Sequence, residues 1–183
     1  MQSYQGEKSS ALDATLVNGT ASHALDFDGL SGTPGGHQSV PLVSMLFALA
    51  EERMGRGDDL IAAYVIGVET EIRLARAVDA HDLDKGWHPA CTLGAIAAVA
   101  AASNFLKLGQ ERTAVALAIA ASLASGIKAD VGAMTKPLHA GQCGRGGASC
   151  GDFRHRSIFD FCNTVGAKRT SLKSHQASYY LPS

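Results

Sequence analysis

Three short segments of the chain place ionisable side chains beside glycine or proline. They read "HALDFDGLSGTPGGHQS" (residues 23–39), "DKGWHPA" (84–90) and "MTKPLHAG" (134–141). Their candidate functional residues are Asp26, Asp28, His37, His88, Lys136 and His139. A lysine and several histidines can neutralise a carboxylate-rich substrate, and an imidazole titrates close to neutral pH, where it can move a proton. If the fold gathers these loops, the residues predict proton transfer on a small organic acid.

Each candidate residue also has a structural interpretation. Asp26 and Asp28 could serve only as turn formers, and His37 among glycines could be an exposed loop residue. His88 is better placed, because "GWHP" holds it between a bulky ring and a proline just before an apolar segment. Lys136 is the strongest candidate, since a lysine before proline at the end of a very apolar segment is not needed for packing.

Other histidines and charges of the sequence favour structural roles. His23 falls inside an expected helix, where packing or capping is its predicted role. We expect solvated loop charges at His81, Asp82 and Asp84.

The cysteines and the known short motifs narrow the chemistry. A zinc site from Cys143, Cys150, His155 and Cys162 is not favoured, because the spacing C-x6-C-x4-H-x6-C lacks the paired short spacings of structural zinc sites. The sequence has no Walker A motif, dinucleotide fingerprint, Gly-x-Ser-x-Gly elbow or His-Glu-x-x-His. Phosphoanhydride chemistry, hydride transfer and serine hydrolysis are therefore unsupported.

Composition predicts one helical domain. The chain has 183 residues, of which 46% are apolar but only 6% aromatic, so its core must be built mainly from Ala, Leu, Val and Ile. A net charge of −1 gives no general field for nucleic acid or acidic lipid. The start has no signal-peptide pattern, and no window reaches the ~18 apolar residues of a membrane span. We expect a cytoplasmic protein with no nucleic-acid or membrane partner.

Hydrophobic periodicity predicts an all-α bundle over residues 10–140, with no strand pattern. Helices are expected over 10–25, 40–55, 58–78, 91–109 and 110–126. The last two are too apolar for surface helices, so we expect both to be buried on most sides. On the exposed side of the third helix, i,i+4 and i,i+5 pairing is expected among Glu69, Glu71, Arg73 and Arg76.

Four consecutive blocks, in order, resemble the MmgE/PrpD family, which includes 2-methylcitrate dehydratase, cis-aconitate decarboxylase and iminodisuccinate epimerase. They are "LVNGTASHALDFDG", "GVETEIRLARAV", "GWHPACTLGAIAAVAAA" and "LAIAASLASGIKADVGAMTKPLHAG", within about residues 10–141. The resemblance implies an all-helical large domain, a smaller α+β lid, a homodimer, and a site that needs neither cofactor nor metal. Residues 1–141 would form part of the helical domain.

The resemblance also implies roles for single residues. Asp26, His37, His88 and Lys136 would be catalytic, while His139 and Asp28 would contact a di- or tricarboxylate substrate. Members often continue "HALDFDDTH", whereas here Gly29 follows Asp28, a departure that affects only substrate contacts in this loop. Members are typically more than twice as long, so we expect a chain truncated at both ends, without the lid, and inactive by itself.

Residues 142–183 depart from the family and have no sustained period, so we expect an irregular tail. Read one nucleotide out of frame, "HAGQCGRG" can spell the family-like "HAGSAAE", which suggests a frameshift from about Gln142. The favoured lineage is a lyase of the 2-methylcitrate dehydratase type, linked to propionate metabolism. The alternatives are an amino-dicarboxylate epimerase of the same family and a non-catalytic oligomerising fragment.

Overall fold

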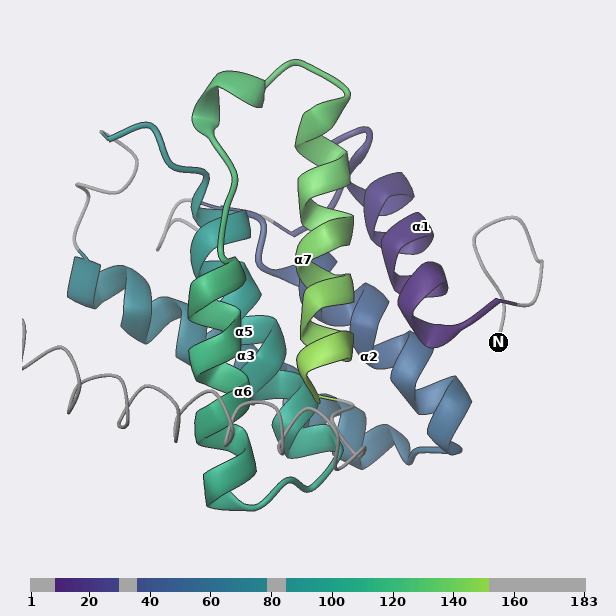
Figure 1. Ribbon diagram of the computed structural model, residues 1–183. Coiled ribbons are helices and arrows are strands. Elements are labelled where there is room, and N and C mark those ends of the chain that lie inside the picture. Colours follow the sequence, from purple (N-terminus) through teal and green to yellow (C-terminus); the bar gives the residue numbers. More distant parts are fainter. Residues whose placement is uncertain (1–8, 30–35, 79–84, 152–183) are drawn as a thin grey trace, which may run out of the picture. The chain divides into compact units, whose positions relative to one another are not determined.

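A computed structural model describes residues 9–29, 36–78 and 85–151 (Figure 1). Within these ranges the chain forms α-helices, one short 3-10 helix and no β-strand, which confirms the predicted all-α bundle. The elements are α1 (Ala11–His23), α2 (Ser39–Arg53), α3 (Gly57–Val78), α5 (Pro89–Phe105), α6 (Gln110–Leu123), η1 (Lys128–Asp130) and α7 (Thr135–Gly151).

Local signals in the sequence set several helix ends. Ser10 caps α1, because its hydroxyl accepts a hydrogen bond from the backbone N–H of Asp13 at 3.1 Å. Pro89 opens α5 at a position where its missing N–H costs nothing, with His88 as the residue before the first turn. Met54 ends α2 in the left-handed conformation, with φ of 53°.

The core lies where α2 and α5 face their neighbours. Leu42, Met45, Leu46 and Leu49 of α2 are at most 1% exposed. They pack with the buried alanines of α5, which are Ala97, Ala98, Ala101 and Ala102. The predicted burial of the helix over 91–109 is therefore confirmed for α5. No helix in the described ranges is long and apolar enough to cross a membrane.

Helix α6 does not match the predicted burial. Ala116 and Ala120 are its buried residues, and Leu123 at its end is 63% exposed. The prediction was wrong because a high content of apolar residues does not reveal how many sides of a helix have neighbours. Here α6 packs on α5 and α7, and its other side faces outward (Figure 1).

Helix α7 corrects the predicted boundary at residue 142. It continues from Thr135 through Gly151, so residues 142–151 are helical rather than irregular. It packs against α1, α2, α5 and α6 (Figure 1). The rest of the predicted tail, 152–183, lies outside the described residues, and the frameshift origin stays a prediction.

Small residues allow this central position of α7. Gly141, Gly144, Gly147 and Gly151 are buried and recur every three or four residues, so they share one side, the glycine face. A Cβ atom on Gly141 would lie 2.5 Å from the carbonyl oxygen of Leu16. On Gly147 it would lie 2.6 Å from the Cβ of Ala98. Larger side chains would therefore force α7 away from α1 and α5.

Glu71 is a buried acid rather than the exposed ion-pair partner that we predicted. Arg73 does pair with Glu69, at 3.1 Å, but Glu71 is fully buried and its carboxylate oxygens have no hydrogen-bond partner among the described residues. Glu71 shares the inner side of α3 with Ala63 and Gly67, at spacings of four. Burial raises the pKa of its carboxyl to about 8, and the nearby Cys91 adds to the shift.

Substitutions on α7 test the glycine face. Gly144→Ala should destabilise the protein by about 1–3 kcal/mol, because the added methyl would meet the carbonyl oxygen of Pro41 at 2.8 Å. Gly146→Ala is the matched control, since no atom lies within 4 Å of its Cβ position, and it should stabilise by about 0.5–1 kcal/mol. Urea unfolding followed by circular dichroism measures both. Equal effects would contradict the packing described.

Substitution of Glu71 should change how stability depends on pH. The folded protein keeps the Glu71 proton up to pH about 8, whereas the unfolded chain releases it near the ordinary value of 4.5. Between these values the unfolded state binds fewer protons, so this residue lowers the free energy of unfolding by roughly 1 kcal/mol per pH unit as pH rises. Glu71→Gln should remove that slope in urea titrations from pH 5 to 8. The control Glu69→Gln should leave it, and a slope unchanged in both variants would refute the assignment.

Candidate functional site

The loop that follows α1 gathers two aspartates and two histidines. Asp28 has a nearly buried carboxylate, 8% exposed, whose Oδ1 lies 3.0 Å from Nδ1 of His23. Its Oδ2 lies 2.8 Å from Nδ1 of His37, an ion-pair contact that lacks hydrogen-bond alignment. The two imidazole rings meet edge to face, with centroids 4.8 Å apart. One carboxylate thus orients both rings.

Asp26 is the more open acid of this loop. Its backbone adopts a φ of 55°, a left-handed conformation that aspartate tolerates better than most residues. Oδ1 of Asp26 lies 3.6 Å from Nδ1 of His23 and 3.8 Å from Nε2 of His37. Asp26 therefore faces both imidazoles while its side chain stays 52% exposed.

Lys136 joins this loop to α7 across 110 positions of sequence. Its Nζ donates to Oδ1 of Asp26 at 2.6 Å, and its own side chain is only 13% exposed. The hydrogen bond from Lys136 lowers the pKa of Asp26, against a smaller opposing effect of burial, and the charges of Lys136, His23 and His37 add to the lowering. We name His23, Asp26, Asp28, His37 and Lys136 the first cluster.

A second cluster forms at the start of α5. The "GWHP" loop is held by hydrogen bonds from His88 N to the Gly126 carbonyl, at 3.1 Å, and from Lys128 N to the Gly86 carbonyl, at 2.8 Å. One helical turn into α5, Cys91 Sγ lies 3.0 Å from Nδ1 of His88. Both side chains are buried.

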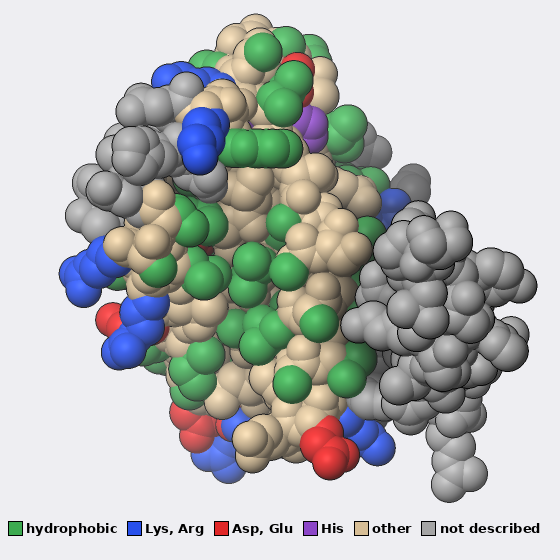
Figure 2. Space-filling view, turned by 60° about the vertical axis from the view of Figure 1, so that its left-hand side comes forward, with side chains coloured by type: hydrophobic (Ala, Val, Ile, Leu, Met, Phe, Trp, Pro, Cys, Tyr) green, Lys and Arg blue, Asp and Glu red, His purple; other side chains and the backbone are tan. Residues whose placement is uncertain are grey.

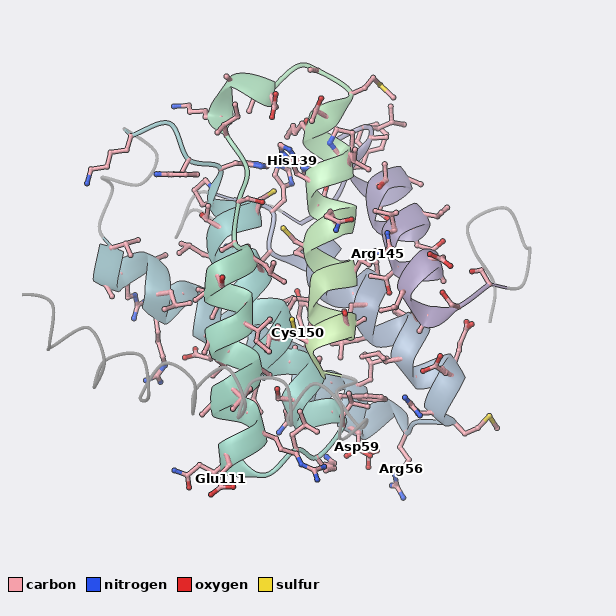
Figure 3. The ribbon with its side chains drawn as sticks, viewed as in Figure 1. Arg56, Asp59, Glu111, His139, Arg145 and Cys150 are labelled. Carbon is pink, nitrogen blue, oxygen red and sulfur yellow. The ribbon has the colours of Figure 1, made fainter. Side chains whose placement is uncertain are left out.

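Helix α7 completes the second cluster, which we define as His88, Cys91, His139 and Cys143. His139 lies near the end of α7 closest to the loops, well apart from Arg145 and Cys150 (Figure 3). One ring nitrogen of His139 lies within 4.8 Å of a ring nitrogen of His88 and of the Sγ of Cys91. The Cys143 thiol donates to the Cys91 carbonyl oxygen at 3.2 Å.

The two thiols of this cluster differ in acidity. Hydrogen bonding from Cys143, and then the neighbouring His88, lower the pKa of the Cys91 thiol, although burial opposes the shift. The neighbouring Cys91 side chain and burial raise the pKa of the Cys143 thiol. Cys91 is therefore the thiol of the pair that ionises first.

The structure brings all six predicted residues into two neighbouring clusters. Lys136 and His139 are one turn apart on α7, so this helix contributes to both clusters. The loop before His37 also approaches the start of α5, because a Cβ atom on Gly36 would lie 3.6 Å from the backbone nitrogen of Ala90. Lys136, however, begins α7 rather than ending an apolar helix. The catalytic and binding roles of these residues stay predictions.

Sequence reasoning missed three members of these clusters, which are His23, Cys91 and Cys143. His23 is buried, as a packing residue would be, but it also contacts Asp28. Its place at the end of α1, directly before the loop that carries Asp26 and Asp28, could have suggested this contact. Cys91 was given no chemical role, although it follows His88 by three residues at a helix start. His81, Asp82 and Asp84 lie outside the described residues.

Comparison with known proteins identifies the family. The model of the MmgE/PrpD N-terminal domain matches residues 3–151, which extends the resemblance ten residues beyond the predicted limit at 141. The chain is 39% identical to cis-aconitate decarboxylase of Homo sapiens over 139 residues, which cover 73% of this chain and 29% of that protein. It is 37% identical to cis-aconitate decarboxylase of Mus musculus over 165 residues, covering 84% of this chain and 34% of that protein.

More distant relatives carry the same name. Cis-aconitate decarboxylase of Aspergillus terreus is 28% identical over 157 residues, covering 82% of this chain and 32% of that protein. The chain thus spans about a third of the length of these relatives. Since the family model covers most of its residues, the chain belongs to the MmgE/PrpD family.

Proposed function

We propose that this chain carries the helical part of a cofactor-independent lyase site that binds a di- or tricarboxylic acid. The observation that carries the proposal is the Lys136–Asp26 ion pair beside the two histidines of the first cluster. A mostly buried lysine whose partner is half exposed can exchange that partner for a substrate carboxylate. The site therefore offers a cation for binding and imidazoles for proton transfer.

Charge balance explains why such a site needs Lys136. Taking several carboxylates out of water without paired cations would cost many kcal/mol, so a buried polyacid requires local positive charge. Lys136 supplies that charge beside the histidines of the first cluster. In the absence of substrate, Asp26 pairs with Lys136 and balances its positive charge.

The contacts of Asp28 support distinct roles for it and for His37. Nδ1 of His37 lies 2.8 Å from Asp28, so the other ring nitrogen, Nε2, is the one available for proton transfer. Nε2 can then accept a proton from a carbon next to a substrate carboxylate. We propose that Asp28 positions the histidines, rather than binding substrate, because its carboxylate is nearly buried between them. His88, from the second cluster, would be the partner acid.

The relatives favour one reaction of the family over the others. Their names describe decarboxylation of cis-aconitate, so we place this reaction ahead of 2-methylcitrate dehydration in propionate metabolism. Epimerisation of an amino dicarboxylate remains the alternative.

We also propose a cytoplasmic location. The chain alone should bind substrate without turning it over efficiently, because its relatives are about three times as long.

Binding of tricarboxylates tests the role of Lys136. Isothermal titration of the chain with cis-aconitate and 2-methylcitrate should show binding that Lys136→Ala weakens roughly tenfold to a hundredfold, since one charge-assisted hydrogen bond contributes about 1.5–3 kcal/mol. Lys128→Ala is the matched control, because Lys128 is an exposed lysine on η1. Equal binding by both variants would refute the assignment of Lys136.

Turnover separates the reactions. The chain and the complete human relative would be incubated with cis-aconitate, 2-methylcitrate and an amino dicarboxylate, and products identified by mass spectrometry. We expect carbon dioxide release from cis-aconitate by the relative and little by this chain. Efficient dehydration or epimerisation by this chain would overturn both the preferred reaction and the proposed inactivity.

Self-association is a second candidate property, favoured by exposed apolar side chains. The face turned forward in Figure 2 carries hydrophobic side chains across its centre, while charged ones lie toward its edges. On α3 and at the end of α6, Ile61 is 64% exposed, Val65 52% and Leu123 63%. A contiguous apolar surface such as the one in Figure 2 typically contacts a partner. Multi-angle light scattering should show dimers that Ile61→Glu with Leu123→Glu converts to monomers, and a monomeric parent chain would exclude this property.

A further inference from the structure

We propose that His88, Cys91 and His139 form a binding site for a zinc-class transition-metal ion. The inference concerns the second cluster alone, and it holds whether or not the first cluster binds a carboxylic acid. It names a ligand for the buried thiol of Cys91, which the proposed lyase chemistry does not use.

The ligand atoms converge from two helices. One ligand atom of each residue lies within 4.8 Å of the others, and Cys91 Sγ is already 3.0 Å from Nδ1 of His88. The Cβ position of Gly126 lies 3.6 Å from both Cys91 Sγ and Nδ1 of His139, so these two atoms face the same small volume. Ligands around a tetrahedral zinc ion stand roughly 2.0–2.3 Å from the metal, which small side-chain rotations would achieve here.

His139 has the arrangement of a metal ligand. Its Nε2 lies 3.5 Å from a carboxylate oxygen of Asp130, while its Nδ1 is buried and has no hydrogen-bond partner among the described residues. Metal-binding histidines usually direct one nitrogen to a carboxylate and the other to the ion. Asp130 would fix the ring, and an ion would satisfy the nitrogen that is otherwise left without a partner.

The donor set selects the class of ion. Two imidazoles and one thiolate suit zinc or related borderline-soft ions, whereas magnesium and calcium require oxygen ligands. Three protein ligands leave a fourth position for water or for an oxygen or sulfur atom nearby, and the thiol of Cys143 lies beside Cys91. Because an ion here would occupy His88, metal binding should compete with any proton transfer by that residue.

The test uses Co²⁺ as the probe on the full chain, because Co²⁺ replaces zinc in tetrahedral sites with nitrogen and sulfur ligands and then absorbs visible light strongly. We expect one equivalent to bind with this absorption. Cys91→Ser should abolish the thiolate-dependent absorption, and Asp130→Asn should weaken binding about tenfold, as loss of a supporting carboxylate commonly does. Cys150→Ser is the matched control, since Cys150 is buried like Cys91 but lies on α7 apart from the cluster (Figure 3).

Each outcome decides the proposal. Circular dichroism establishes that each variant is folded, and Asp130→Asn provides a test that removes no buried side chain. Absorption unchanged in Cys91→Ser, or lost equally in Cys150→Ser, would place the metal at other thiols and overturn the proposal. No absorption by the parent chain would overturn it as well. A thermal unfolding temperature that Zn²⁺ raises in the parent chain but not in Cys91→Ser would support it independently.

Discussion

The close packing of α7 against α1, α2 and α5 is the constraint on which both clusters depend. Its glycine face removes the side chains that would hold the helices apart, so backbone meets backbone near Leu16 and Pro41. Because α7 carries Lys136 and His139 near its first turns, its position sets where a cation meets Asp26 and where an imidazole meets Cys91. A methyl group added to the glycine face would therefore displace α7 and lengthen the contacts that Lys136 and His139 make in the two clusters.

The two clusters share α7 but differ in their chemistry. The first is built from oxygen and nitrogen atoms in which Asp28 orients two imidazoles and Asp26 balances Lys136. Its open acid and its cation suit exchange with an anionic ligand. The second contains a buried thiol and an imidazole nitrogen without a partner in the part of the chain that the structure describes, which suits a soft metal ion.

Glu71 extends the second cluster into the core. Its carboxyl keeps its proton because it is buried and because Cys91 lies close enough to disfavour a second negative charge. Gly94 of α5 leaves room for this side chain, since a Cβ there would stand 3.9 Å from one of its oxygens. Keeping a buried acid neutral beside an ionisable thiol lowers the free energy of unfolding at neutral pH. Strongly shifted pKa values of this kind are frequent at functional sites.

The sequence by itself determined the helical class, most helix positions and the family. These follow from periodicity, from Ser10 and Pro89 at helix starts, and from ordered motifs around Asp26, His88 and Lys136. Only the tertiary structure decided which sides of the helices are covered, and so it placed Glu71 inside and α6 largely outside. It also decided that His23 and Cys91 join the clusters and that α7 continues to Gly151. The physical reason is that periodicity reports local conformation, whereas burial and pairing depend on which helices meet.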